Sequence, residues 1–297
     1  MSRFLLSNRR TRITRHFEAL AQERHPDSAP QALRRTAEYL ADEFSRHGWT
    51  TTRQLFRAMG RTFPNILAIR NPIGGRRLPR PAPLLIGAHY DTVAGSPGAD
   101  DNASGLIVLL EIAERLSEAP PERPVWLAAF CLEEQGLLGS AAFAARLRKL
   151  KQPLGGAVIL ECVGYASEEE GSQRKPPGIP VPVPAAGNFL GIIGNDASRR
   201  LVTVVEEAAR RAVPALKTLG LTVPGCGKSL PDVRRSDHAA FWDEGYQAVM
   251  LTDTANYRNP HYHQPTDRVD TLNFDFLEGV IDVVGASLAA RTGPNAE

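Results

Sequence analysis

From residue 84 onward, short apolar runs alternate with segments of helical periodicity. The runs Leu84 to Ala88, Pro124 to Cys131 and Ala157 to Leu160 are typical of strands buried on both faces of a sheet. Residues 104–117 and 140–150, between them, have helical spacing. The alternation continues with strands at 189–193, 216–223 and 248–251 and helices at 197–212 and 274–290. Because strands that alternate with helices form βαβ units, this pattern predicts a mostly parallel sheet with helices on both faces.

A segment before this pattern and an interruption within it complete one domain over 1–297. Before it, we expect helices at 11–25 and 31–47, strands at 51–56 and 65–70, and a Gly/Pro/Arg loop at 71–83. Within it, residues 166–186 hold three consecutive Glu and five Pro. This composition predicts a surface excursion, either a lid or a poorly ordered loop.

Composition excludes several classes of protein. The 297 residues are 42% hydrophobic and 23% charged, which is ordinary for a globular protein. The net charge of +2 gives no field that would favour nucleic acid or an anionic membrane as a partner. No apolar run approaches the ~20 residues of a membrane span, and the first ten residues lack the apolar core of a secretory signal. Three Cys do not form a disulfide framework, so we expect a cytoplasmic protein with Cys131 and Cys162 as buried thiols.

Polar residues directly follow the apolar strands, where ligands bind in an open parallel sheet. The first group is His89-Tyr90-Asp91. Residues two apart on an extended chain face the same way, so His89 and Asp91 can point into one site. His is a common metal ligand, and its second nitrogen usually needs a carboxylate or carbonyl partner. The alternative is a His–Asp pair that only forms a hydrogen bond within a loop.

Two further groups carry adjacent acids. In Gly98 to Gly105, we expect Asp101 to bind metal and Asp100 or Asn102 to cap the following helix. After the next strand, Glu133 and Glu134 point in different directions, so one can bind metal while the other acts as general base. A solvated strand end is the alternative for these two acids.

The remaining groups are a strand-end acid and two histidine segments. Glu161 closes an apolar strand, and His261-Tyr262-His263 offers two His in three residues, of which one could bind metal. Ser236-Asp237-His238 is not preceded by a nucleophile elbow, so we assign it a supporting role and not that of a catalytic triad.

Taken in order and without the Ser236 segment, the other five elements resemble the di-zinc aminopeptidase family, which includes bacterial secreted aminopeptidases and, more distantly, glutamate carboxypeptidase II. The resemblance covers about residues 30–290. It implies the fold of the phosphorylase/hydrolase-like zinc exopeptidases, a three-layer α/β sandwich whose mixed, mostly parallel central sheet is flanked by helices. It also implies two zinc ions per chain, for which Mn or Co could substitute at O and N ligands.

The resemblance also implies roles for individual residues. Asp101 would bridge the two zinc ions, with His89 and Glu161 on one ion and Glu134 and His263 on the other. Many members of the family have Asp at the position of Glu161, which keeps the charge and the oxygen ligands.

Three other positions match residues that act on the substrate or support a ligand. Glu133 would be the general base, Asp91 would orient the metal-binding His89, and Tyr262 would help to stabilise the tetrahedral intermediate. The implied function is a metal-dependent exopeptidase, an aminopeptidase that removes N-terminal residues from peptides or aminoacyl substrates.

Two alternatives stay open. Glutaminyl-peptide cyclotransferases have a similar fold and one zinc, and they can keep a similar His-x-Asp; the run Asp101-Asn102-Ala103-Ser104-Gly105 is more similar to the peptidases. A non-catalytic protein of the same fold is the second alternative. It would usually have lost ligand positions, and all five are metal-competent here.

Overall fold

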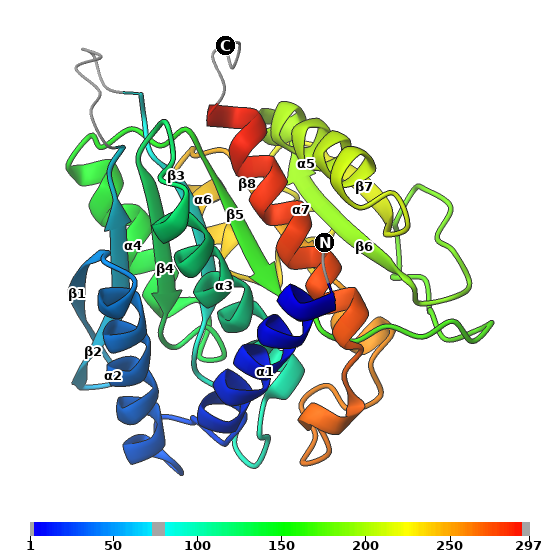
Figure 1. Cartoon of the computed structure of the whole chain (residues 1–297). Helices are drawn as coiled ribbons and strands as arrows, with labels where there is room; N and C mark the ends of the chain where they lie inside the picture. Colours follow the sequence, from blue (N-terminus) through cyan, green and yellow to red (C-terminus); the bar gives the residue numbers. More distant parts are fainter. Residues whose placement is uncertain (1–2, 73–80, 293–297) are drawn as a thin grey trace.

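An eight-stranded sheet runs through the centre of the protein (Figure 1). The computed structural model describes residues 3–72 and 81–292. The strand order is β1-β2-β4-β3-β5-β8-β6-β7. The strands are β1 (Thr50–Ala58), β2 (Arg61–Arg70), β3 (Leu84–His89), β4 (Val125–Phe130), β5 (Gly156–Glu161), β6 (Phe189–Asn195), β7 (Lys217–Val223) and β8 (Ala248–Thr252).

Parallel pairing holds the middle of the sheet. The strands β4, β3, β5 and β8 are neighbours and all parallel, and β6 pairs in parallel with β7. The pairings β1–β2, β2–β4 and β6–β8 are antiparallel. The prediction of a mixed, mostly parallel sheet is therefore confirmed.

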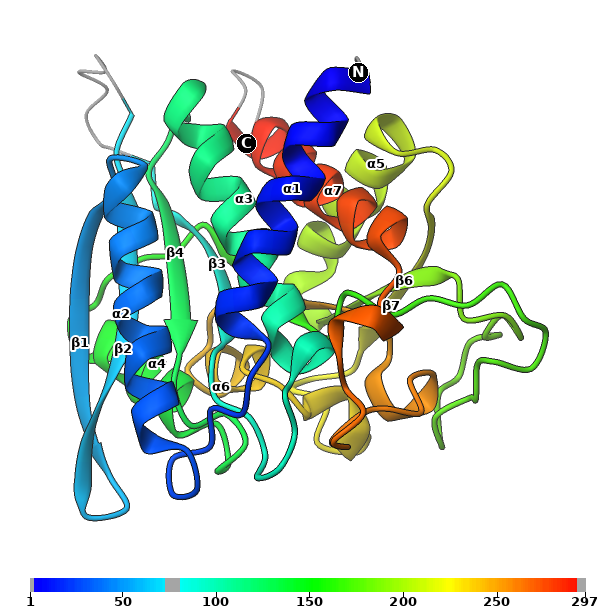
Figure 2. The same ribbon diagram turned by 60° about the horizontal axis from the view of Figure 1, so that its bottom comes forward.

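Helices cover both faces of this sheet (Figures 1 and 2). The helices are α1 (Arg3–Leu20), α2 (Pro30–Arg46), α3 (Gly105–Glu118), α4 (Leu138–Lys149), α5 (Arg199–Ala212), α6 (His238–Asp243) and α7 (Phe274–Thr292). One layer contains α2, α3, α5 and α7, with α1 lying across the outer side of α3, and the opposite layer contains α4 and α6. The result is the expected three-layer α/β sandwich.

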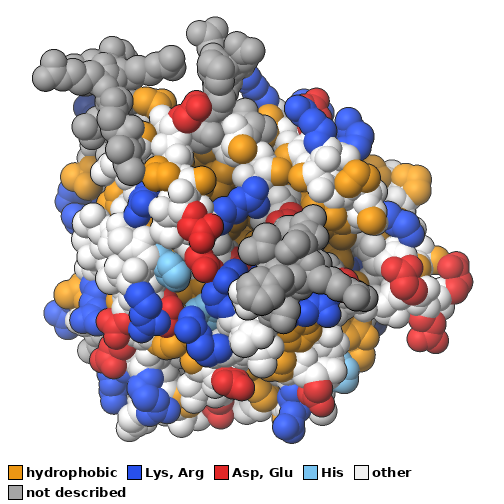
Figure 3. Space-filling view, viewed as in Figure 1, with side chains coloured by type: hydrophobic (Ala, Val, Ile, Leu, Met, Phe, Trp, Pro, Cys, Tyr) orange, Lys and Arg blue, Asp and Glu red, His pale blue; other side chains and the backbone are white. Residues whose placement is uncertain are grey.

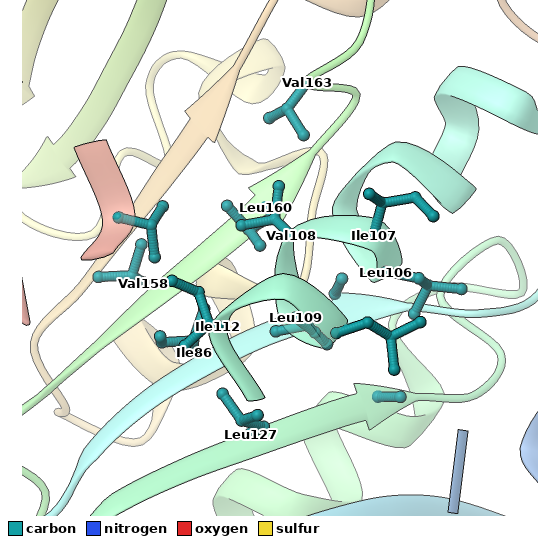
Figure 4. Packing of buried hydrophobic residues seen from close by; sticks show 14 of the residues in the cluster. Ile86, Leu106, Ile107, Val108, Leu109, Ile112, Leu127, Val158, Leu160 and Val163 are labelled. Atoms are coloured by element: carbon teal, nitrogen blue, oxygen red, sulfur yellow. The ribbon is translucent and has the colours of Figure 1, made fainter. Parts of the chain in front are cut away.

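Two hydrophobic clusters fill the spaces between the layers. Figure 4 shows the first, in which Leu109 and Ile112 of α3 lie over Ile86 and Leu127 of the sheet. Burial of one such side chain contributes about 1.5–3 kcal/mol. In the second cluster, a Cβ at Gly87 would come within 2.6 Å of the Phe130 ring. A side chain there would displace the aromatic packing beneath the strand that ends on His89.

The predicted elements agree with the structure apart from some boundaries. The first helix spans Arg3–Leu20 instead of residues 11–25, and α6 was not predicted, because six residues are too few to show a helical period. The predicted loop 71–83 lies mostly outside the described residues. Residues 166–186 contain no helix or strand and extend beside β6 (Figure 1).

The distribution of charged side chains on the described surface agrees with the small net charge of +2. On the face seen in Figure 3, acidic and basic side chains are interspersed, with hydrophobic side chains scattered between them. Within the described residues, no helix has the length and apolar character needed to cross a lipid bilayer.

Candidate metal centre

The candidate site lies where the central parallel strands end. Because β4, β3, β5 and β8 are adjacent and parallel, the chain leaves all four at the same edge of the sheet. His89 is the last residue of β3, and Glu161 is the last residue of β5. Glu133 and Glu134 follow β4, and His263 lies in the long segment after β8.

A first group of metal-competent atoms comes from His89, Asp101 and Glu161. One ligand atom from each residue lies within 4.8 Å of the other two. The Nε2 atom of His89 is 3.1 Å from Oδ1 of Asp101 and 3.5 Å from Oε2 of Glu161. All three side chains are buried.

A second group contains Asp101 again, with Glu134 and His263. The Nε2 atom of His263 is 3.0 Å from Oδ2 of Asp101 and 3.3 Å from Oε2 of Glu134. The two carboxylate oxygens of Asp101 therefore face two different histidines. The five residues that were expected as ligands come together in two groups that share Asp101.

The polar atoms of these groups fit a pair of bound cations. His89 Nε2, Asp101 Oδ1, Glu134 Oε1 and His263 Nε2 are buried, and none makes a well-formed hydrogen bond within the described part of the chain. Buried polar atoms without partners are costly, so such a cluster is typical of a site that can bind a cation. Imidazole nitrogens with carboxylate oxygens are a donor set that suits zinc.

The loop that carries Asp101 is fixed by its neighbours. Asp267 accepts hydrogen bonds from the backbone N–H groups of Asp100 at 2.8 Å and Asp101 at 3.1 Å. Asn102 accepts a hydrogen bond from the N–H of Gly105, the first residue of α3, at 3.2 Å, although the N-cap position of that helix is held by Ser104 and not by Asp100 or Asn102 as expected. The Asp100 carboxylate accepts from Gly164 and from the Asn259 side chain.

Asp91 supports the site mainly through the backbone. Its carboxylate accepts hydrogen bonds from the N–H groups of Glu133 and Glu134, both at 3.1 Å. Its carbonyl oxygen lies 3.2 Å from Nδ1 of His89, whereas the nearer carboxylate oxygen is 3.7 Å away. The partner of His89 is thus a carbonyl, and the carboxylate holds the segment that carries the two Glu.

Comparison with known proteins gives the family. The sequence model of peptidase family M28 matches residues 65–288. The chain belongs to peptidase family M28. It is 36% identical over 281 residues to the uncharacterized protein YfbL of Escherichia coli, covering 89% of this chain and 83% of that protein. It is 27% identical to aminopeptidase YwaD of Bacillus subtilis over 76% of this chain, but it spans only 44% of that relative.

Solved structures agree with this assignment. A zinc aminopeptidase from Bacillus subtilis superposes with a TM-score of 0.61 and 27% identity over 80% of this chain and 52% of its own. LapA of Legionella pneumophila has a TM-score of 0.72 at 20% identity, over 94% of this chain and 72% of its own, which shows the shared fold. The fold is also that of a glutaminyl cyclase from Porphyromonas gingivalis, with a TM-score of 0.67 at 18% identity over 93% and 94% of the two chains.

Charge coupling at this M28 site changes the proton affinity of both histidines. Burial lowers the pKa of His89, but the charges of Glu161 and Glu133 more than offset this, so its pKa is raised well above the usual value. Burial also lowers the pKa of His263, yet contacts with Asp101 and Glu134 raise it to about 10. In the metal-free protein both imidazoles hold protons that a metal ion would displace.

Glu133 belongs to neither group that contains Asp101, but it forms a third group of possible ligand atoms with His89 and Glu134. Its carboxylate is within 4.8 Å of ligand atoms of His89 and Glu134. Burial raises its pKa well above the usual value, and the charges of Glu161 and Asp237 add to this effect. Its backbone N–H is held by Asp91, and this contact fixes the position of the segment. A carboxylate with raised proton affinity next to a metal centre suits a general base.

Tyr262 connects the metal centre to a neighbouring pocket. Its ring stacks on His263 at 3.8 Å between centroids, and its hydroxyl accepts a hydrogen bond from Arg235 at 3.2 Å. Burial and the charge of Asp101 raise the pKa of its phenol, so it is neutral and able to donate. The pocket that it shares with Glu161 is lined mainly by apolar side chains: Pro176, Ile179, Ile193, Val233 and Met250.

Several functional contacts had no clear signal in the sequence. Ser236 donates a hydrogen bond of 2.7 Å to Oε2 of Glu161. His238 makes a 2.7 Å contact with the carbonyl of Val233, so Ser236 and His238 face different partners, which agrees with the rejection of a catalytic triad. Short polar residues before a helix are common, and only the fold brings Ser236 to Glu161, 75 positions away.

Proposed function

We propose that this M28 protein is an aminopeptidase that holds two zinc ions bridged by Asp101. One observation carries the proposal: the two carboxylate oxygens of Asp101 face separate histidines, His89 at 3.1 Å and His263 at 3.0 Å. Each of these histidines has a further carboxylate nearby, Glu161 in one group and Glu134 in the other. A site for a single metal ion would not require the two oxygens of one aspartate to face two different histidines.

Residues of this chain would perform the proton transfers. When bound, the two zinc ions would supply Lewis acidity that activates water and polarises the scissile carbonyl. Glu133 accepts a proton at its carboxylate during the attack and returns it to the departing amine. Tyr262, whose phenol stays protonated, donates a hydrogen bond toward the negative charge that develops on the carbonyl oxygen.

The pocket beside the centre supports action at one end of a peptide. It begins at Glu161 and Tyr262 and is lined mainly by apolar side chains. Ile179 and Pro176 come from the excursion at 166–186, so this segment forms one wall of the pocket. A pocket of this kind suits the side chain of a terminal residue. The names of the relatives YwaD and the Bacillus zinc enzyme also favour an aminopeptidase.

Metal analysis joined to a substrate panel tests this function. The metal-free protein is titrated with zinc, and the bound metal is counted after removal of excess ion. We expect two zinc ions per chain, hydrolysis of aminoacyl-anilides, and no hydrolysis of the same anilides with a blocked amino group or of carboxypeptidase substrates.

Other outcomes of the same experiment would assign a different function to the protein. One zinc per chain with cyclisation of N-terminal glutaminyl peptides identifies a cyclotransferase, whose fold this chain shares. Failure to bind zinc at micromolar metal identifies a non-catalytic member of the family. Two zinc ions with turnover of only the blocked or carboxypeptidase substrates would refute the aminopeptidase assignment and leave the metal centre intact.

A further inference from the structure

Arg24 is a fully buried arginine that lies before the part of the chain matched by the family model. It follows α1 in the chain, and its guanidinium reaches the loops that precede the metal centre. Nε donates to the carbonyl of Tyr90 at 2.8 Å, Nη1 to that of Pro97 at 3.0 Å, and Nη2 to that of Gly98 at 3.1 Å. The same Nη1 also contacts the carbonyls of Leu20 and Gln22, so its two hydrogens are shared among three acceptors.

The carbonyls of Tyr90, Pro97 and Gly98 belong to the two segments that present candidate ligands. Tyr90 lies directly after His89, and Gly98 lies three residues before Asp101. The backbone N–H of Arg24 also donates to the hydroxyl of Thr92 at 2.9 Å. One side chain therefore joins the segment that leaves β3 to the loop that carries Asp101.

The same loop is held on its other side by a carboxyl group. Asp267 accepts from the N–H groups of Asp100 and Asp101, while Arg24 donates to the carbonyl of Gly98. The backbone is closely packed at Gly98, so a side chain would not fit there. Gly98 has φ +60°, and a Cβ there would lie 2.3 Å from the carbonyl oxygen of Asp101 and 2.9 Å from Nη2 of Arg24. The guanidinium on the carbonyl of Gly98 and the carboxyl group on the two amides together fix the backbone of Asp101.

A buried guanidinium is a costly way to connect two loops. No ion pair found among residues 3–72 and 81–292 includes Arg24, so its charge is balanced by carbonyl dipoles and by carboxylates at longer range. Burial lowers the pKa of Arg24 to about 10, and the charges of Asp267 and Asp101 act in the opposite direction. The guanidinium stays charged at neutral pH and places a positive charge beside the acidic metal centre.

We propose that Arg24 is a positioning residue that holds His89 and Asp101 in register for metal binding through the carbonyls of Tyr90, Pro97 and Gly98. The proposal rests on the proposed two-metal function, because it assigns these two residues as ligands. Arg24 does not touch the metal or the substrate pocket, so its effect reaches turnover only through the geometry of the loops. Loss of residues that orient ligands typically lowers metal affinity about 10–100-fold.

The test compares two substitutions of Arg24 with a matched buried arginine on α1. Arg24→Lys keeps the charge and loses most of the donors, and Arg24→Met removes both. Arg9→Met is the control, because Arg9 is also buried and pairs with Glu111 at 3.5 Å and Asp282 at 3.1 Å, away from the ligand loops. Three quantities are measured for each full-length variant: zinc affinity by chelator competition, kcat and KM at saturating zinc, and amide hydrogen exchange of residues 90–104 without metal.

For Arg24→Lys we expect zinc affinity at least about tenfold below that of the parent, a lower kcat with KM within about twofold, and faster exchange in 90–104. Arg24→Met should have larger effects in the same direction. Arg9→Met should lower the melting temperature while zinc affinity and exchange in 90–104 stay at parental values.

Parental zinc affinity and exchange in Arg24→Lys would overturn the proposal, as would equal losses in Arg9→Met. If neither Arg24 variant folds while Arg9→Met does, Arg24 is required by the fold itself and the proposal is overturned. If the parent binds no zinc, the proposed function fails, and the exchange of 90–104 still decides whether Arg24 holds the loops.

Discussion

Replacing Glu133 with Gln should separate turnover from metal binding. The substitution keeps the size of the side chain and removes the proton acceptor. Glu133 lies within 4.8 Å of ligand atoms of His89 and Glu134, but it belongs to neither group that contains Asp101. Zinc should therefore still bind at two ions per chain, while the chemical step loses its base.

The expected loss in rate follows from the burial of the site. General base catalysis contributes about 10²–10⁴-fold, which corresponds to about 3–5 kcal/mol of barrier. Glu133 is only 9% exposed as a whole residue, so little solvent water can replace it as proton acceptor. We therefore expect kcat to fall by about 10³–10⁴-fold, with KM changed much less.

The neighbouring residue provides a matched control. Glu134→Gln makes the same chemical change one position along, in a residue whose Oε2 lies 3.3 Å from Nε2 of His263. This variant should lose one zinc as well as activity. The assay is hydrolysis of an aminoacyl-anilide at saturating zinc, with metal counted in the same samples. Parental turnover by Glu133→Gln, or equal loss of zinc in both variants, would refute the assignment of Glu133.

Three further predictions follow from the contacts at the centre. Asp101→Asn should lose both zinc ions and His263→Ala only one, as counted by elemental analysis; equal losses would contradict a bridging role for Asp101. Ser236→Ala removes the 2.7 Å hydrogen bond to Glu161 and should weaken one zinc about tenfold, since bonds to charged groups contribute about 1.5–3 kcal/mol; unchanged chelator competition would count against it. In the metal-free protein, the folded-state pKa is raised from 4.5 to about 7 for Glu134 and from 6.5 to about 10 for His263, so the stability that each proton gives is complete below the lower value and lost as pH rises through the higher one. The melting temperature without metal should fall as pH rises from about 4.5 to about 10, and added zinc should reduce that fall; a rise without metal would contradict these shifts.

The alternation of apolar runs and helical periods was sufficient to predict the three layers of the fold. The runs at 84–88 and 157–160 were correctly predicted as the strands β3 and β5, because a strand buried on both faces is a continuous apolar run in the sequence. The strand order was not predictable, since β8 pairs with β5 in parallel and with β6 in antiparallel orientation. Such pairings depend on contacts between distant segments, which single-sequence periodicity does not record.

The candidate site was predictable where a polar residue ends an apolar strand. His89 and Glu161 stand at such ends, and the chain geometry alone brings them to one edge of the sheet. Arg24 gave no signal, because it is one of 35 Lys and Arg residues and acts on backbone carbonyls, which every residue possesses. A contact to a backbone atom leaves no pattern of paired side chains in the sequence.

The position of Glu161 shows why a ligand has to be interpreted together with the residue that orients it. Many members of the family were expected to have Asp here, and the extra methylene adds about 1.5 Å of reach. In this chain that reach is used, because Oε2 of Glu161 accepts from Ser236 at 2.7 Å while it lies 3.5 Å from Nε2 of His89. A shorter side chain could not keep both contacts unless the backbone before α6 moved toward β5. The choice between Asp and Glu at this position therefore depends on where Ser236 lies, and the two residues must be compared as a pair between relatives.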